Sequence, residues 1–295
     1  MRSPLPDAPR VRLKTVLGRY PYLAPLREAS FDDPCVGFDF VEVTPVPKAF
    51  APMVRTFAYD LSEMAVVTAL QAFAYRKPII LLPAVVASRF QRGCLIRHRD
   101  RPLAGARALV GKTIGVRSFT QTTGMWVRAA LYDDYGLLAN EMRWRVSEGA
   151  HLDEYLAPSF VERDESGKTL PDQLRDGGIA AAIMGADLPE SAEFVPVLAD
   201  HEASDRAWYA RHGWVPINHM VVVRADLAAT QPKAVRAAWR LIRAAAAGAT
   251  GTLFGTDAVR EPLAYIEGEA RRQGLLPHPV DVDALLEPAS RLLGE

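Results

Sequence analysis

The sequence predicts an α/β protein built from two lobes. Residues 79–86 and 179–185 are continuous apolar segments of the kind that form strands buried on both faces of a parallel sheet. Polar loops follow the predicted strands in both halves of the chain. The 295 residues, of which 49% are hydrophobic, can fill two moderate cores, and at this length a second lobe is expected.

The first elements of the chain are short. The pattern predicts strands at 11–17 and 36–44 and short helices at 20–28 and 48–55. Gly18 and Arg19 form the loop after the first strand. Asp60 and Glu63 then resemble a capping box, with Asp in place of Ser or Thr, which predicts a helix from residue 60 to about 75. The same two carboxylates are candidates for acid–base chemistry.

A change in composition predicts the border between the lobes. Residues 98–109 are polar and rich in arginine, which is typical of a crossover between domains. We therefore predict one lobe from residues 1–101 and 216–295, and a second from residues 102–215. The closing elements of the first lobe are a strand at 220–223 and helices at 232–249, 260–273 and 285–293.

Residues 111–136 combine a buried strand, a polar loop and a helix start. The strand is predicted at 113–116, with Thr122 or Thr123 as the helix N-cap and Gly136 near the helix end. A helix N-terminus presents unpaired N–H groups and a partial positive charge, which suits a carboxylate or phosphate. Arg117 and Thr120 lie in the same loop. The alternative is an ordinary turn in which the threonines only cap the helix.

The rest of the second lobe follows the same pattern. A strand at 142–146, a polar excursion at 148–168 and a helix at 170–176 precede the buried strand at 179–185. Ligands of open α/β sheets bind at the carboxyl ends of strands. Residues 184–187, with Gly185, should therefore face the same cleft as Thr122.

Composition excludes several classes of function. The formal net charge is zero, with 35 basic and 35 acidic residues, so nothing indicates binding to nucleic acid. No segment is long enough for a membrane span, and the N-terminal residues lack the apolar core of a signal peptide. A cytoplasmic location is therefore expected. Homo-oligomer formation is left open.

Sequence motifs also argue against metal and nucleotide sites. Cys35 and Cys94 have no metal-ligand spacing, and the six histidines form no paired motif. A serine-hydrolase elbow, a P-loop and a dinucleotide fingerprint are absent from the sequence. His219 stands between a loop and a buried strand, where an imidazole either exchanges protons near neutral pH or fills the core with one hydrogen bond.

Four separated motifs, taken together, resemble the 4,5-dihydroxyphthalate decarboxylase family. They are FAPMVRTFAYDLSEMA from Phe50, KPIILLPAVVASRFQ from Lys77, LVGKTIGVRSFTQTTGMWVRAAL from Leu109 and PINHMVVV from Pro216. The resemblance covers roughly residues 11 to 250. That family is similar to the type 2 periplasmic binding proteins, in which two α/β lobes hold a ligand in the cleft between them.

The resemblance implies a carboxy-lyase that acts on a hydroxylated aromatic dicarboxylate without a cofactor. On this hypothesis His219 transfers the proton, while Asp60, Ser62 and Glu63 hold the phenols. The remaining candidates would bind the substrate, its carboxylate above all: Arg19, Arg117, Thr120, Thr122, Thr123, Trp126 and Gly185. The alternative function is a non-catalytic binding protein that delivers a small aromatic or other carboxylate to a transporter or sensor.

Overall fold

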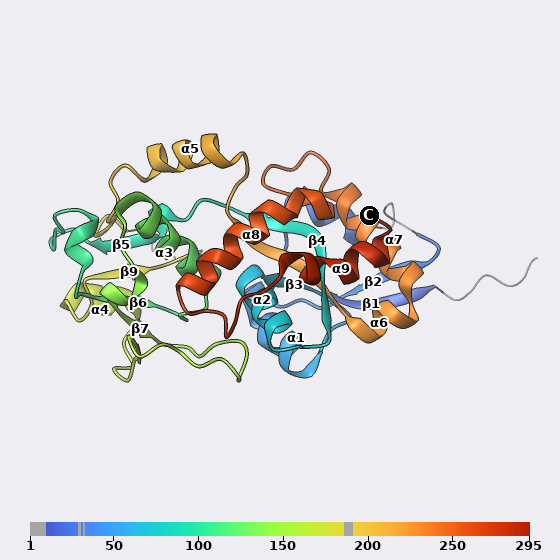
Figure 1. Ribbon diagram of the computed structural model, residues 1–295, viewed down its shortest axis with the longest axis horizontal. Coiled ribbons are helices and arrows are strands. Elements are labelled where there is room, and N and C mark those ends of the chain that lie inside the picture. The colour runs from blue at the N-terminus through green and yellow to red at the C-terminus, as the bar shows by residue number, and fades with distance from the viewer. Residues whose placement is uncertain (1–9, 29–30, 32, 186–190) are drawn as a thin grey trace, which may run out of the picture.

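The computed structural model has an elongated shape with one β-sheet toward each end (Figure 1). It describes residues 10–28, 31, 33–185 and 191–295. Both sheets have six strands and mix parallel with antiparallel pairs. The predicted two-lobed α/β architecture is therefore confirmed.

The first sheet contains both ends of the chain. Its strands are β1 (Val11–Val16), β2 (Val36–Phe40), β3 (Leu61–Ala65), β4 (Ile79–Ser88), β11 (Ile217–Arg224) and β12 (Leu253–Phe254). They lie in the order β12-β4-β11-β3-β1-β2. Strand β1 is parallel to β2 and β3, whereas β11 runs antiparallel to its neighbours β3 and β4. Strands β3 and β11 are thus adjacent although about 150 residues separate them.

The second sheet is built from the middle of the chain. Its strands are β5 (Leu95–His98), β6 (Thr113–Val116), β7 (Arg143–Val146), β8 (Val161–Arg163), β9 (Ala181–Ile183) and β10 (Phe194–Pro196). They lie in the order β10-β5-β9-β6-β7-β8. Strand β6 is parallel to both β7 and β9, so the carboxyl ends of these three strands share one edge of the sheet.

The pairing of β5 differs from the predicted border between the lobes. This strand precedes Arg101, yet it pairs with β9 and β10 of the second sheet. The chain therefore crosses between the end of β4 and the start of β5. The arginine-rich residues around 101 follow β5 as a turn within the second sheet, because a polar composition marks exposure and not the crossing itself. The return to the first sheet occurs between β10 and β11.

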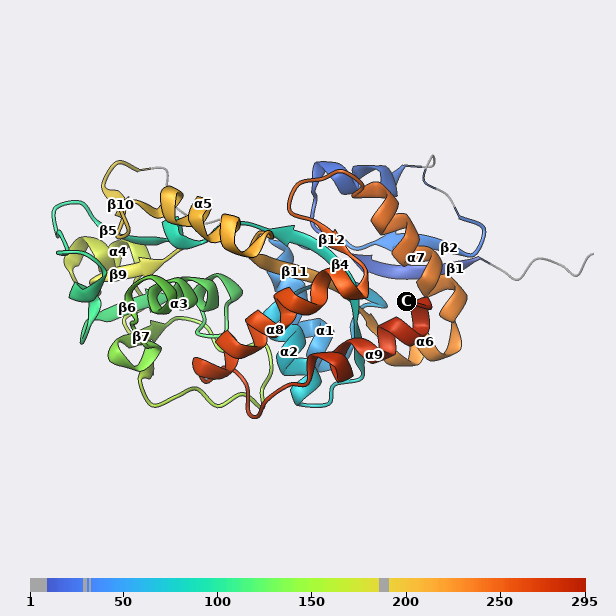
Figure 2. The same ribbon diagram turned by 45° about the horizontal axis from the view of Figure 1, so that its top comes forward.

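Nine helices surround the sheets in the described part of the chain. They are α1 (Phe50–Thr56), α2 (Val66–Ala74), α3 (Thr122–Tyr135), α4 (Leu170–Asp176), α5 (His201–His212), α6 (Ala225–Thr230), α7 (Pro232–Ala245), α8 (Thr256–Arg272) and α9 (Val282–Leu293). Figures 1 and 2 show α8 reaching from the first lobe to α3 of the second. None of the described helices is long and apolar enough to cross a membrane.

Buried side chains join the two lobes beside α3. Trp126 on α3 donates its indole N–H to the carbonyl of Ile217 at the start of β11, over 2.7 Å. Arg128, also on α3, is buried and donates to the Gln273 side chain just after α8. Gln273 in turn donates to the carbonyl of Met125. The start of β11 is therefore tied to α3.

The segment from Asp60 to Ala65 is not the start of a helix. Residues 61–65 form β3, with every side chain buried, and α2 begins only at Val66. The capping-box prediction was wrong because the pattern is local, whereas β3 is stabilised by ladders to β1 and β11 from distant parts of the chain. Glu63 is consequently a carboxylate buried in the middle of a sheet.

Candidate active site

Glu63 and His219 form a hydrogen-bonded pair on adjacent strands. His219 lies opposite Ala65 in the ladder between β11 and β3, and Glu63 is two residues from Ala65, so both side chains project from the same face of the sheet. His219 Nδ1 lies 2.6 Å from Glu63 Oε1. Glu63 is fully buried, whereas the His219 side chain keeps 18% of its surface exposed. The imidazole therefore connects a buried carboxylate with the surface of the site.

The Glu63 carboxylate is satisfied by three donors. Besides His219, it accepts the N–H of Gly18 and the hydroxyl of Tyr20, both over 2.6 Å. Burial, and next the charge of Glu63, raise the pKa of Tyr20, so that its phenol stays protonated and donates. A buried carboxylate is costly without such partners. With these donors around Glu63, we assign the remaining proton to His219 Nδ1, which leaves Nε2 available to a ligand.

The N-terminus of α3 supplies a polar group of the second lobe. The N-cap is Gln121, without a side-chain cap, and Thr122 and Thr123 are the first residues of the helix. The prediction of a threonine cap was wrong by one position because the preceding Gln121 already has the extended backbone of a cap. The hydroxyl of Thr122 is buried and has no hydrogen-bond partner among the described residues. This helix start therefore keeps unsatisfied polar groups.

Gly185 lies between Arg89 and the start of α3. A Cβ atom at this position would be 2.9 Å from Arg89 Nη2 and 3.6 Å from both Gln121 Nε2 and Thr123 Oγ1. The Arg89 guanidinium thus packs so closely on this glycine, beside the helix start, that a side chain here would have to displace it. Ala186 and Asp187, which were predicted on the same edge, lie outside the described residues.

Arg89 is a cation of the site that the sequence analysis did not select. It follows β4 directly, its side chain is exposed, and no carboxylate of the described residues pairs with it. Its charge acts on Tyr20, where it lowers the pKa against the larger effect of burial. Arg89 therefore lies between the Tyr20 and Glu63 cluster of the first lobe and the α3 start of the second. Its position directly after a strand could have identified Arg89 from the sequence, but Arg19 and Arg117 also follow strands, so this position does not distinguish among the three.

Two predicted substrate-binding arginines are paired with carboxylates instead. Arg19 Nε lies 2.9 Å from Glu42, and 72% of the Arg19 side chain is exposed. Arg117 Nε lies 3.6 Å from Glu148. Thr120, from the same loop as Arg117, is buried and contacts the Ser118 hydroxyl. Arg19 is therefore largely exposed and paired, whereas Arg117 Nε, although near Glu148, is buried without a hydrogen-bond partner among the described residues.

Three further predicted residues do not join the Glu63–His219 pair. The Asp60 carboxylate accepts the N–H of Lys14 and lies 3.5 Å from Arg224, at the far end of β11 from His219. Ser62 follows Asp60 on β3 and is the neighbour of Glu63, so its side chain points to the opposite face, where its hydroxyl donates to a backbone carbonyl. The ring of Trp126 packs in a cluster with Trp208, Trp214 and Tyr265.

His151 is a second imidazole near the pair, and the sequence analysis missed it. Its Nδ1 lies 2.8 Å from the hydroxyl of Thr68 on α2. The ring of Phe50 makes edge contacts with both imidazoles, at 5.6 Å from His151 and 5.1 Å from His219. Burial, followed by the charges of Arg117 and Arg55 and by His219, lowers the pKa of His151 to about 4. The ring is therefore neutral at pH 7.

Lowering the pH from 7 to 5 is expected to destabilise the fold by about 2 kcal/mol through His151 alone. The unfolded imidazole has its ordinary pKa of 6.5, whereas the folded one has a pKa of about 4. The unfolded state therefore binds a proton first, and stability falls as the pH drops from 6.5 toward 4. Urea unfolding at both pH values measures the effect. His151→Gln should show a shallower loss, and an identical loss would contradict the assignment.

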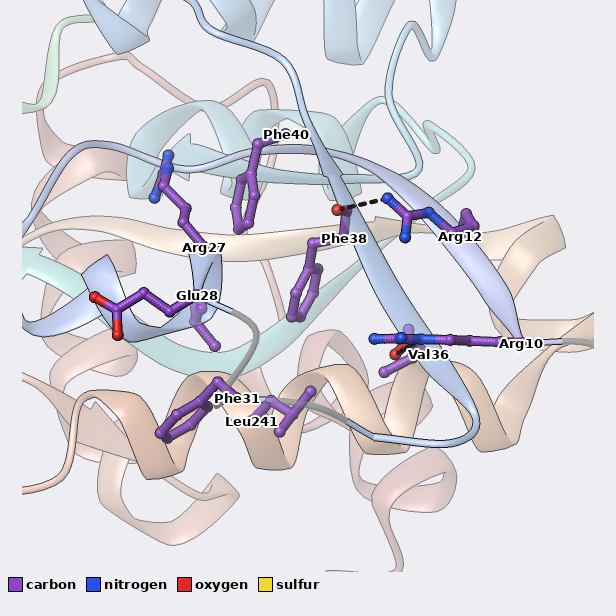
Figure 3. Close-up of a pocket in the computed structure, with 10 residues that line it drawn as sticks. Arg10, Arg12, Arg27, Glu28, Phe31, Val36, Phe38, Phe40 and Leu241 are labelled. Carbon is purple, nitrogen blue, oxygen red and sulfur yellow. Dashed lines mark hydrogen bonds between the residues drawn. The ribbon is translucent and has the colours of Figure 1, made fainter.

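Two measured cavities lie away from the Glu63–His219 pair. One of about 300 Å³ is bordered by Arg10, Arg12 and Arg27 with aromatic side chains of β2 (Figure 3). Its Arg12 is paired with Asp39, and its Arg27 lies over the Phe40 ring. The other, of about 420 Å³, is lined by second-lobe residues and Arg55. Neither of these two cavities includes Glu63 or His219 in its lining.

No cluster of three or more His, Cys, Asp or Glu side chains suited to a metal ion occurs within the described residues. The two cysteines there are free, with Cys35 exposed and Cys94 buried. Burial raises the pKa of Cys94, which keeps it as a thiol. Among the described residues, the imidazoles, Tyr20, Arg89 and the start of α3 can act on a ligand.

Comparison with curated proteins finds relatives across most of the chain. A protein of Comamonas testosteroni named 4,5-dihydroxyphthalate decarboxylase is 26% identical over 282 residues, which is 89% of this chain and 83% of that protein. A protein of Pseudomonas putida with the same name is 26% identical over 182 residues, which is 59% of this chain and 70% of that protein. No family model matches the chain.

Solved structures share the architecture. A DszB mutant in complex with biphenyl-2-sulfinic acid has a TM-score of 0.56 at 14% identity, over 96% of this chain and 99% of that chain. A putative sulfonate-binding protein of Methylobacillus flagellatus has a TM-score of 0.55 at 10% identity, over 97% and 96%. A Candida albicans protein described as having the generic periplasmic binding protein fold has a TM-score of 0.50 at 12% identity, over 97% and 90%. The chain therefore has the periplasmic binding protein fold and is a relative of the proteins named 4,5-dihydroxyphthalate decarboxylase.

Proposed function

We propose that the protein is a carboxy-lyase that converts a hydroxylated aromatic dicarboxylate of the 4,5-dihydroxyphthalate type to protocatechuate. The observation that carries this proposal is the hydrogen-bonded pair of buried Glu63 and partly exposed His219. Arg89, whose charge acts on the neighbouring Tyr20, has no carboxylate partner among the described residues. An imidazole held by a carboxylate is suited to deliver a proton. In decarboxylation, the ring carbon that loses the carboxylate must gain a proton. The two curated relatives support the same reaction.

The proposed reaction balances without an oxidant or a reductant. The hydroxyl para to the departing carboxylate gives up its proton and pushes electrons into the ring. An acid then protonates the ring carbon that bears this carboxylate, the bond to the carboxylate breaks, and the electron pair restores the aromatic ring as carbon dioxide leaves. The phenolate regains a proton at the end. In principle no cofactor is needed, and we propose that the reaction proceeds without one in the cytoplasm.

Each role falls to a group with matching chemistry. We assign proton delivery to His219 Nε2, which first takes up the proton that the phenol gives up, with Glu63 holding the opposite nitrogen and stabilising the charged ring. We assign the retained carboxylate to Arg89 and the start of α3, where Thr122 has a free hydroxyl. Arg117 stays a weaker candidate for the same carboxylate because Glu148 lies beside it.

Incubation of the purified protein with 4,5-dihydroxyphthalate tests this function. The expected result is release of carbon dioxide and protocatechuate in equal amounts, with protocatechuate measured by chromatography. Phthalate, which lacks both hydroxyls, is the matched control and should not be decarboxylated because no phenol can push electrons into its ring. Saturable binding of the dihydroxy compound without turnover would overturn the enzyme proposal and favour a carboxylate-binding protein.

A further inference from the structure

The loop between β7 and β8 connects the two lobes. We call residues 147–160 the interlobe loop; in Figure 2 it runs from β7 along the lower edge of the molecule toward α8. Arg55 on α1 donates to the carbonyls of Ala150 and His151 over 2.9 and 2.8 Å and pairs with Asp153 over 2.8 Å. Tyr155 donates to the carbonyl of Gly274. The second lobe thus places this loop firmly against the first.

Docking of the interlobe loop brings His151 to the site from the opposite lobe. Its Nδ1 is held by Thr68, and its Nε2 makes no hydrogen bond within the described residues. His219 has the same arrangement, with Nδ1 held by Glu63 and Nε2 left over. The Phe50 ring makes an edge contact with each of the two imidazoles. Two imidazoles from different lobes therefore flank one aromatic side chain, each with one free nitrogen.

The partners of the two imidazoles differ. His219 is backed by the fully buried carboxylate of Glu63. His151 is backed by a hydroxyl and lies within reach of the charges of Arg55 and Arg117, which disfavour a protonated ring. A neutral imidazole is a poor partner for a carboxylate but a good one for a hydroxyl, from which it can accept a hydrogen bond and to which it can donate one.

We propose that His151 is a substrate-contacting residue that recognises a ring hydroxyl of the aromatic ligand and is placed in the site by the interlobe loop. This inference rests on the proposed function and adds the residue that distinguishes hydroxylated from plain aromatic carboxylates. His219 would act on the reacting carbon from one side, while His151 holds a hydroxyl from the other. This division of roles follows from the partners of the two imidazoles, which are the Glu63 carboxylate for His219 and the Thr68 hydroxyl for His151.

Equilibrium binding of protocatechuate, the proposed product, and of benzoate tests this inference, because the two ligands differ only in two hydroxyls. The parent protein is expected to prefer protocatechuate. His151→Gln should reduce that preference by about tenfold, the effect of one hydrogen bond, while benzoate binding stays unchanged. Thr68→Val, which removes only the partner of Nδ1, should reduce the preference by a smaller factor.

Glu154→Gln is the matched control. It breaks the ion pair of Glu154 with Lys77 in the same loop without touching His151, and should leave the preference as in the parent. An unchanged preference in His151→Gln, or equal loss of both ligands, would overturn the role of His151. If the parent protein converts 4,5-dihydroxyphthalate, the proposed function stands even when the role of His151 is refuted. A parent protein that neither binds nor converts 4,5-dihydroxyphthalate would refute both the proposed function and the role of His151.

Discussion

Replacing His219 by asparagine is expected to slow decarboxylation by about 10²- to 10⁴-fold while the affinity for substrate stays near that of the parent. The side chain delivers its proton only in the transition state, so its loss should lower kcat and kcat/KM together. Its position supports this role, because Glu63 holds Nδ1 and part of the ring is exposed. Steady-state kinetics with 4,5-dihydroxyphthalate, together with equilibrium binding of protocatechuate, separate the two effects.

Two further variants sharpen this experiment. Glu63→Gln keeps the shape but removes the charge that holds the imidazole, so a large loss of rate is expected there as well. Asp60→Asn, directly before the same strand, is the matched control. The Asp60 carboxylate contacts Lys14 and Arg224, so its replacement should leave the rate close to that of the parent. Normal turnover by His219→Asn would move proton transfer to Tyr20 or Glu63, and an unfolded variant would identify His219 as a core residue.

Much of the fold could be predicted because apolar patterns report burial directly. The continuous apolar run at 79–86 became β4 within two residues of its predicted end, and the strand at 113–116 is β6 as predicted. Strand β3 could not be predicted in the same way. Its sequence LSEMA has a carboxylate in the middle, and only the ladder to β11, far along the chain, explains why that carboxylate is buried.

Their roles at the site stay predictions, but the positions of His219 and Gly185 beside recognisable apolar runs were predictable. The choice among the arginines was not. Arg19, Arg89 and Arg117 all follow strand ends. Only the tertiary structure shows that Glu42 lies beside Arg19 and that Glu148 lies beside Arg117. His151 lies in a polar excursion without periodicity, and contacts from the opposite lobe place it.

Replacing Arg89 by alanine is expected to weaken binding of an aromatic carboxylate by about 10²-fold. This loss is near the lower end of the range for removing one partner of a charge pair, because the Arg89 side chain is exposed to water. The guanidinium lies beside Gly185 and the start of α3 and has no carboxylate partner among the described residues. Among the described residues, no carboxylate therefore competes with the ligand for its charge. Titration with benzoate at low and high salt measures the loss.

Arg117→Ala is the comparison that decides between the two arginines. Because Glu148 already lies beside Arg117, its removal should cost much less affinity than removal of Arg89. Arg89→Lys should restore only part of the binding, since an ammonium cannot make the two parallel hydrogen bonds of a guanidinium. A larger loss in Arg117→Ala than in Arg89→Ala would return the anion site to the loop after β6, and would mean that the ligand displaces Glu148 when it binds.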